Sequence, residues 1–472
     1  MTMAMVFALY AAVAGVFLSL ISLYRASTRP DVWSFFASTP GWIFVCSSIV
    51  GMFSIGVMVR IQKQSTPADK RRVAFAIGMN LVMLVLTVGS TELFARYVSK
   101  QTPAGKTLLG VLLYPKEWSE FAAYYRKVIE EIAHGSSYEV YDPVLGWTVG
   151  PSRMDRTGFY LSSTEGLRSP RAGMSFADLR TRHSAVSETP ASLRIALIGD
   201  SMTYGHEVRC EESWGHALEA QLQPHTQVLN FAIGAQGLNQ TLLRYEKDVR
   251  PMKPRIVIIG VTSAMITRNN NIYPFLKDPE WGMPFARPRF VLTNDDVTAI
   301  RVPVPDAREI FSTLAIAELP DLHLDDYYRP YQWERGGVWY LLEKSYIFRF
   351  AYSLKPPSDD RAAERELNAM QVGQVVTQRL VREVLQDGAV PLVVYLPYKD
   401  EIAFSAESEA KDLPRSARML RNAGIKYFDP TACLLTMKLS DAYMRESHYS
   451  PQASAHIARC LTPVIQNILN ET

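Results

Sequence analysis

The stretch "IGDSMTYG", residues 198–205, follows the apolar residues "IAL" at 195–197. Such a run is typical of a buried strand, and glycines at 199 and 205 allow a tight turn after it. A serine at the carboxyl end of a parallel strand stands where α/β enzymes present a reactive group. Ser201 is therefore a candidate nucleophile. The alternative is a serine that only caps a helix.

Strand and helix patterns alternate from residue 194 to the end of the chain. This alternation predicts an α/β fold with a parallel sheet, right-handed crossovers and three α/β/α layers of flavodoxin-like character. The predicted strands are 194–198, 227–231, 255–260, 392–396 and 426–428, and the predicted helices are 212–222, 238–249, 364–386, 416–423 and 451–468.

The chain divides into three predicted regions. Residues 1–98 are expected to be a membrane anchor, 99–192 a linker and N-terminal extension with a helix at 117–134, and 193–472 the α/β domain. Within that domain, residues 267–360 interrupt the alternation and are rich in Pro, Trp, Tyr and Asp. We expect this insertion to cover or line the site, with structure of its own, because long structureless loops are uncommon in compact domains.

Three apolar stretches, 5–24, 41–59 and 73–97, predict three transmembrane helices. Each is close to the ~20 residues that cross a bilayer. The first lacks a basic n-region and is too long for a cleaved signal peptide. Basic residues dominate the loop at 60–72, which therefore faces the cytoplasm. The N-terminus is then cytoplasmic too, and the chain after residue 98 is extracytoplasmic, in the periplasm of a bacterium with two membranes.

Composition argues against several classes of function. The net charge of +3 gives no nucleic-acid footprint. No Cys/His cluster has metal-ligand spacing, and no phosphate-binding glycine motif is present. We therefore expect no metal, no cofactor and no nucleic acid. Among four cysteines, Cys433 and Cys460 are the pair we expect to form a disulfide, and two unpaired buried thiols are the alternative.

Four short segments follow the predicted strands or precede the last helix: "GDS" at 199–201, "NFAIGAQG" at 230–237, "GVTSAM" at 260–265 and "ESHYSPQASAH" at 446–456. Their order and spacing resemble the SGNH, or GDSL-like, hydrolase family over residues 194–265 and 365–470. The N-terminal apolar stretches are similar to those of its envelope-associated, membrane-anchored members.

The resemblance implies that Ser201 is the nucleophile and that His448 is its base. A serine hydroxyl needs an adjacent base to react at neutral pH, and His448 stands just before the last predicted helix. The other histidines have no comparable position. A solvated loop histidine is the alternative reading of His448.

This sequence departs from the family pattern at the acid. An aspartate three residues before the histidine is usual there, and Arg445 holds that position. Glu446 is the candidate that would orient His448 and stabilise its charged form. Asp441 is a weaker candidate, and a Ser–His dyad without an acid is also possible.

The oxyanion donors depart from the pattern as well. The resemblance places the backbone N–H of Ser201 and of Ala235 in the oxyanion hole. Thr262 stands where the family has an asparagine, so its hydroxyl is the candidate third donor, and Asn269 or Asn270 could replace it. Losing one such donor costs about 3 kcal/mol.

The predicted function is that of a serine esterase or O-acyltransferase on a cell-envelope glycan or glycolipid. Transfer would allow a membrane acyltransferase as partner. Two alternatives remain: a lipase-like enzyme acting on membrane lipids, and a non-catalytic envelope scaffold that keeps the fold and binds glycan or a membrane partner.

Overall fold

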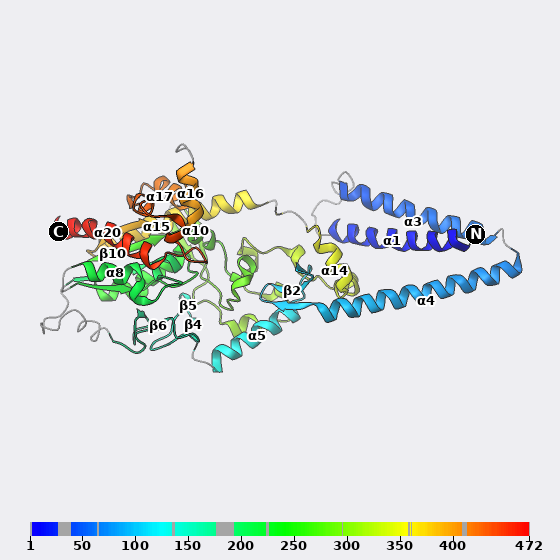
Figure 1. The fold of residues 1–472 in the computed structure, drawn as a ribbon, viewed down its shortest axis with the longest axis horizontal. Helices are drawn as coiled ribbons and strands as arrows, with labels where there is room; N and C mark the ends of the chain where they lie inside the picture. Colours follow the sequence, from blue (N-terminus) through cyan, green and yellow to red (C-terminus); the bar gives the residue numbers. More distant parts are fainter. Residues whose placement is uncertain are drawn as a thin grey trace.

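The computed structural model describes residues 2–26, 39–63, 66–134, 137–175, 193–222, 226–294, 296–356, 359, 361–407 and 413–471. The molecule is elongated (Figure 1). Long helices lie at one end, the α/β domain lies at the other, and the predicted extension and insertion lie between them.

A five-stranded parallel sheet forms the centre of the α/β domain. Its order is β14-β13-β10-β8-β9, which is 2-1-3-4-5 when read from β9 and numbered along the chain. This order confirms the predicted flavodoxin-like architecture. The strands are β8 (Leu193–Ile198), β9 (Thr226–Asn230), β10 (Ile256–Val261), β13 (Val390–Tyr395) and β14 (Tyr427–Phe428).

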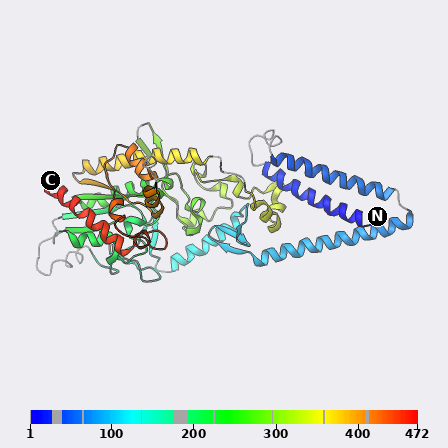
Figure 2. The ribbon, with the colours of Figure 1, turned by 45° about the horizontal axis from the view of Figure 1, so that its top comes forward.

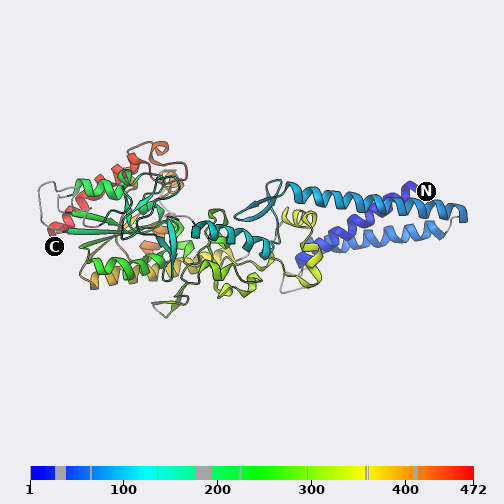
Figure 3. The same ribbon diagram turned by 90° about the horizontal axis from the view of Figure 1, so that it is seen from below.

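Helices cover both faces of the sheet, so the domain has three layers. Central strand β10 is buried over its whole length, because Val257 and Ile259 pack into one helical layer and Ile256 and Ile258 into the other. Figures 2 and 3 show the long helices α15 and α20 on opposite sides of the strands. One layer contains α9 (Leu238–Arg244), α15 (Ala362–Gln386) and α17 (Arg415–Asn422), and the other contains α8 (Trp214–Gln221) and α20 (Pro451–Glu471).

The region predicted as linker and extension is more ordered than its sequence suggested. Helix α5 (Trp118–His134) confirms the predicted helix and buries Phe121 and Tyr125. Short antiparallel strands surround it, and alternation over so few residues gave no signal in the sequence. Residues 176–192 lie outside the described residues. The strands are β1 (Lys100–Thr102), β2 (Gly105–Leu108), β3 (Val111–Leu112), β4 (Glu139–Asp142), β5 (Gly146–Val149), β6 (Leu161–Ser162) and β7 (Arg168–Ser169).

The insertion reaches well beyond the α/β domain. It contains a hairpin of β11 (Phe290–Thr293) and β12 (Asp296–Ala299), several short helical turns, and α14 (Tyr346–Ser353). Helix α14 lies against the ends of the N-terminal helices (Figure 1). The insertion therefore joins the α/β domain to those helices, a role that its sequence did not indicate.

Two sets of contacts hold α14 in that place. Phe348 and Tyr352 pack against Tyr24 at the end of α1 (Thr2–Ala26). The carboxylate of Glu92 accepts hydrogen bonds from the N–H groups of Tyr346 and Ile347, at 2.8 and 3.1 Å. N–H groups in the first turn of a helix have no acceptor within that helix. Glu92, which belongs to α4 (Pro67–Val98), therefore supplies the acceptor for the first turn of α14.

One helix is long and apolar enough to cross a membrane by length and composition. Among the described residues, it is the part of α4 at Lys70–Val98, which contains an 18-residue window with a mean hydropathy of 2.1. The apolar parts of α1 and of α3 (Thr39–Lys63) are shorter, at Tyr10–Arg25 and Ser48–Val57. The structure therefore supports one of the three predicted spans, and the other two stay a prediction.

The predicted disulfide is present. Cys433 in α18 (Thr431–Leu434) is bonded to Cys460 in α20. The bond closes the stretch of chain that contains His448, so it restricts the loop in front of α20.

Candidate active site

Ser201 lies at the carboxyl edge of the sheet, where β8 ends. Gly199 and Asp200 form the turn, and Ser201 opens the short helix α7 (Ser201–Tyr204). The Asp200 side chain caps this helix by accepting a hydrogen bond from the Met202 N–H at 3.1 Å. Because β8 has β9 on one side and β10 on the other, Ser201 lies at the topological switch point, where such sheets bind ligands.

Glycines at two strand ends let α7 approach the sheet. A Cβ atom added to Gly199 would lie 2.4 Å from Thr203 Oγ1, and one added to Gly260 would lie 1.9 Å from the same atom. Both distances are far shorter than any contact between non-bonded atoms. The glycines of the quoted motif and of β10 are therefore required for the position of Ser201.

His448 reaches Ser201 from the loop before α20. His448 Nε2 lies 2.9 Å from Ser201 Oγ, although the two residues are 247 positions apart. The loop is fixed to the sheet edge because the hydroxyls of Tyr443 and Tyr449 both donate to the carbonyl oxygen of Pro397, at 2.8 and 3.1 Å. The structure thus brings together the two residues that the sequence singled out.

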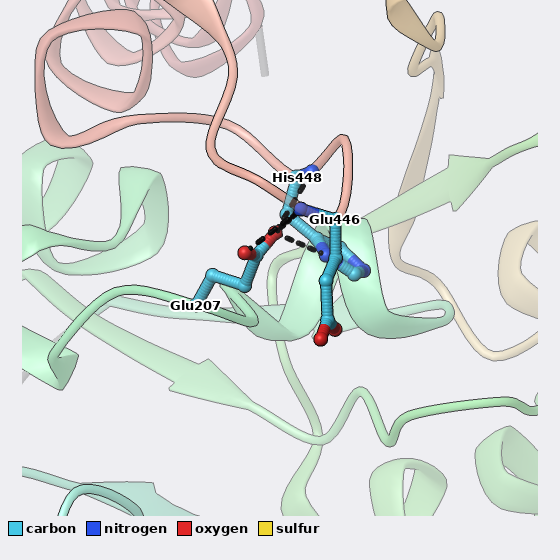
Figure 4. A group of neighbouring side chains, drawn as sticks. All are labelled: Glu207, Glu446 and His448. Atoms are coloured by element: carbon cyan, nitrogen blue, oxygen red, sulfur yellow. Dashed lines mark hydrogen bonds and ion pairs between the residues drawn. The ribbon is translucent and has the colours of Figure 1, made fainter. Parts of the chain in front are cut away.

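The acid that contacts His448 is Glu207, which sequence reasoning missed. Glu207 Oε2 lies 2.9 Å from His448 Nδ1. The same carboxylate accepts hydrogen bonds from the backbone N–H groups of Glu446 and His448, at 2.9 and 3.3 Å (Figure 4). An ionised carboxylate only accepts, so Nδ1 carries the proton and Nε2 can accept the Ser201 proton.

The prediction that Glu446 orients His448 is not what the structure shows. Glu446 contributes its backbone N–H, while its side chain is largely exposed and lies 3.9 Å from His206 Nε2. No hydrogen bond joins the Glu446 carboxylate to the His448 ring among the described residues. The weaker candidate, Asp441, accepts from the Ser440 hydroxyl instead. The signal that could have revealed Glu207 is its position in the segment that follows the nucleophile.

Charges at the site are set by burial and by these hydrogen bonds. Burial of Glu207 opposes its charged form, but the Glu446 N–H and the contacts with His448 outweigh that effect and lower the Glu207 pKa. His206 stacks on Tyr160 and meets the His448 ring edge to face, with centroids 4.8 Å apart. Burial and the nearby His448 lower the pKa of His206 to about 4, so His206 is neutral at neutral pH.

Two backbone N–H groups are unpaired among the described residues, one at the start of α7 and one in the turn after β9. Neither the Ser201 N–H nor the Ala235 N–H has a hydrogen-bond acceptor among the residues that the structure describes. Ala235 has φ +63°, a left-handed conformation that costs a non-glycine residue about 1–2 kcal/mol. The alanine thus adopts a backbone shape that glycine would adopt without strain.

The predicted third donor is engaged elsewhere. The Thr262 hydroxyl donates to Asp200 Oδ2 at 2.7 Å, and a hydroxyl has only one proton to give. The neighbouring Arg268 Nη1 lies 3.1 Å from the same oxygen, so Thr262 and Arg268 together hold the buried Asp200. Asn270 does not replace Thr262, because its Nδ2 donates to the Arg365 carbonyl. Asn269 Oδ1 accepts the Leu238 N–H, while its buried Nδ2 has no hydrogen-bond partner among the described residues, so Asn269 as a third donor stays a prediction.

One group of side chains has the composition of a metal site. Ligand atoms of Glu207, Glu446 and His448 lie within 4.8 Å of one another, the single such group in the described parts of the chain. The Glu207 carboxylate and the His448 ring, however, already bind each other, which suits proton transfer better than metal ligation. The expectation of no metal and no cofactor stays a prediction.

Comparisons with known proteins add little. No family model matches this chain, and no curated protein does. Among solved structures, the acetylxylan esterase Axe2 from Geobacillus stearothermophilus is 13% identical over 58% of this chain and 94% of its own, with a TM-score of 0.29. A protein assigned to the lipolytic G-D-S-L family, from Desulfitobacterium hafniense DCB-2, is 15% identical over 56% and 94%, with a TM-score of 0.27. Such scores carry no argument about this chain.

The first prediction separates the two glutamates. Glu207→Gln removes the charge that orients and stabilises His448, so we expect kcat on a small activated ester to fall by about 10²–10⁴-fold. Glu446→Gln keeps the backbone N–H that binds Glu207, so we expect less than about a threefold change. Steady-state hydrolysis of p-nitrophenyl acetate measures both. The reverse order of effects would make Glu446 the functional acid.

The second prediction concerns acid stability. The pKa of Glu207 is lower in the folded chain than its ordinary 4.5, so its charged contacts stabilise the fold above about pH 4.5 and are lost as the pH falls through the folded value. Glu207→Gln removes this titration. We expect the difference in unfolding free energy between wild type and variant to shrink below about pH 4.5. Urea unfolding from pH 3 to 7 measures it, and a constant difference would contradict the assignment.

Proposed function

We propose that this chain is an extracytoplasmic serine esterase or O-acyltransferase, held in a membrane by its N-terminal helices. It would remove or transfer a small acyl group, such as acetyl, on a cell-envelope glycan or glycolipid. The observation that carries the proposal is the hydrogen-bonded series Ser201–His448–Glu207, with both links at 2.9 Å, at the switch point of the sheet.

In the first half of the reaction, Ser201 Oγ attacks the acyl carbon. Its proton passes to His448 Nε2, and the resulting positive charge on the imidazole is stabilised by Glu207. The former carbonyl oxygen becomes an oxyanion, which accepts hydrogen bonds from the N–H groups of Ser201 and Ala235. When the C–O bond to the substrate breaks, the departing alkoxide takes the proton from His448.

In the second half, His448 removes a proton from water or from an acceptor hydroxyl. The oxygen of that molecule attacks the acyl-enzyme, and Ser201 leaves with the proton that His448 returns. Water gives an esterase and a sugar hydroxyl gives an acyltransferase. The same residues serve both outcomes.

A glycan substrate is supported by an exposed aromatic side chain that is linked to the site through Arg268. Trp281 is 45% exposed, and its ring lies 5.1 Å from the Arg268 guanidinium. Arg268 in turn binds Asp200, the neighbour of Ser201. An exposed indole joined in this way to the residue before Ser201 offers an apolar platform on which a sugar ring can lie.

The extracytoplasmic location is supported by two features. The long apolar α4 is attached to the α/β domain through α14, and the Cys433–Cys460 disulfide suits an oxidising compartment. A largely apolar cavity lies between α1 and α3 and is lined by Val16, Leu20, Met52 and their neighbours. These helices lie at the opposite end of the molecule from the α/β domain (Figure 1), so the cavity gives no support to a lipase.

The third prediction tests the nucleophile. A fluorophosphonate probe should label the wild-type chain at Ser201, and Ser201→Ala should abolish that labelling, because the probe needs an activated serine. Intact-protein mass spectrometry measures it. Labelling of the wild type would exclude a non-catalytic scaffold, and no labelling of a folded wild-type chain would overturn the proposed function.

The fourth prediction tests the glycan. Trp281→Ala should raise KM for an O-acetylated oligosaccharide by about three- to tenfold, because the stacking surface is lost. Turnover of p-nitrophenyl acetate, which has no sugar, should stay within about twofold. Tyr340→Ala, an exposed aromatic on α13 (Tyr340–Glu343) beside α14, is the matched control. Equal effects on both substrates would refute a sugar platform at Trp281.

A further inference from the structure

The turn after β9 contains a non-glycine residue in a left-handed conformation. Ala235 is held at φ +63°, a conformation that glycine adopts freely and alanine does not. In the proposed reaction the Ala235 N–H donates a hydrogen bond to the oxyanion. If the turn relaxed to a backbone conformation with negative φ, this donor would move away from the reacting oxygen. The surrounding side chains must therefore stabilise this conformation.

Two buried side chains bind the carbonyls on either side of Ala235. Trp147 Nε1–H donates to the Gly234 carbonyl oxygen at 3.2 Å. Arg287 Nη2–H donates to the Ala235 carbonyl oxygen at 3.1 Å. The Gly234 carbonyl and the Ala235 N–H belong to the same planar peptide group, so the indole bond fixes the direction in which that N–H points.

The two side chains also hold each other. The Arg287 guanidinium lies 5.4 Å from the centre of the Trp147 ring, a cation–π contact. Both residues are 0% exposed. The main-chain oxygen of Trp147 accepts from Gln236 Nε2 at 3.2 Å, so the turn itself binds back to β5. The result is a closed set of contacts around one peptide group.

Burial of the Arg287 guanidinium has a large desolvation cost, which packing alone does not explain. No carboxylate lies within ion-pair distance of it among the described residues, and Asp278 and Asp325 favour its charge only from farther away. Its second polar contact is the Asn271 side chain. Burial lowers the pKa of Arg287 to about 9, which still leaves it charged at neutral pH. Burying a charge without a partner of opposite charge is costly, so its binding to the Ala235 carbonyl and the indole ring calls for a functional reason.

We propose that Trp147 and Arg287 are positioning residues that clamp the Ala235 peptide, so that its N–H is aimed at the developing oxyanion. The inference rests on the proposed function and extends it to two segments outside the sheet. Trp147 comes from β5 in the extension, and Arg287 comes from the insertion. Both segments then contribute to catalysis without contacting substrate.

The fifth prediction tests the clamp in the full-length chain. Trp147→Phe keeps a ring and removes only the N–H and the larger indole face. We expect kcat on p-nitrophenyl acetate to fall by about ten- to a hundredfold, with KM changed by less than about threefold, because the lost contact acts in the transition state. Trp118→Phe is the matched control: its buried indole N–H also donates to a carbonyl, that of Thr313, at 3.0 Å and away from the turn.

A double-mutant cycle separates positioning from general destabilisation. Glycine adopts the left-handed turn without strain, so the loss caused by Trp147→Phe should be at least about threefold smaller when it is made together with Ala235→Gly. A purely structural role for Trp147 would give the same loss in both backgrounds. Equal effects of Trp147→Phe and Trp118→Phe on kcat, at equal melting temperature, would also overturn the clamp.

Hydrogen exchange makes the test independent of the proposed function. Trp147→Phe should speed exchange of the amides in residues 234–237, while Trp118→Phe should not. A chain with no esterase activity but with this change would refute the proposed function and keep the clamp on the turn. Unchanged exchange at 234–237 would refute the clamp whatever the activity.

Discussion

The Glu207 carboxylate is the interaction on which the site depends. It accepts hydrogen bonds from the His448 ring and from the backbone N–H groups of His448 and Glu446. One side chain near the start of the α/β domain thereby fixes both the position and the tautomer of a residue near its end. Bonds to a charged acceptor are stronger than those between neutral groups, so this carboxylate both orders the loop before α20 and prepares its histidine.

The strands and the helices of the two layers could be predicted because each leaves a local mark in the sequence, whereas the sequence did not decide between the Cys433–Cys460 disulfide and two unpaired thiols. Buried strands such as β10 are continuous apolar runs, and a helix such as α15 repeats its apolar residues at helical spacing. The catalytic pair also followed from position, because Ser201 ends the first strand and His448 precedes the last helix.

The acid was missed because its role depends on backbone shape rather than on its spacing from His448. Glu207 follows α7 and has φ +64°, a left-handed conformation in which its carboxylate contacts the His448 ring. The sequence "GHEV" at 205–208 does not predict that conformation at Glu207, and Glu446 is the acid nearest to His448 in sequence. The prediction of Thr262 as third oxyanion donor was wrong for a related reason. Its position at the end of β10 was correct, but its single hydroxyl proton is donated to Asp200.

The contact between α14 and the N-terminal helices has a consequence for where such an enzyme can work. A domain on a flexible tether would sweep through a volume, but Glu92 and Tyr24 attach this one through packed side chains and the cap of a helix. With α4 embedded as proposed, the catalytic serine would stay at a nearly constant height above the lipid surface. Polymers would then be modified in a thin layer of the envelope as they pass that height, and chains farther out would escape.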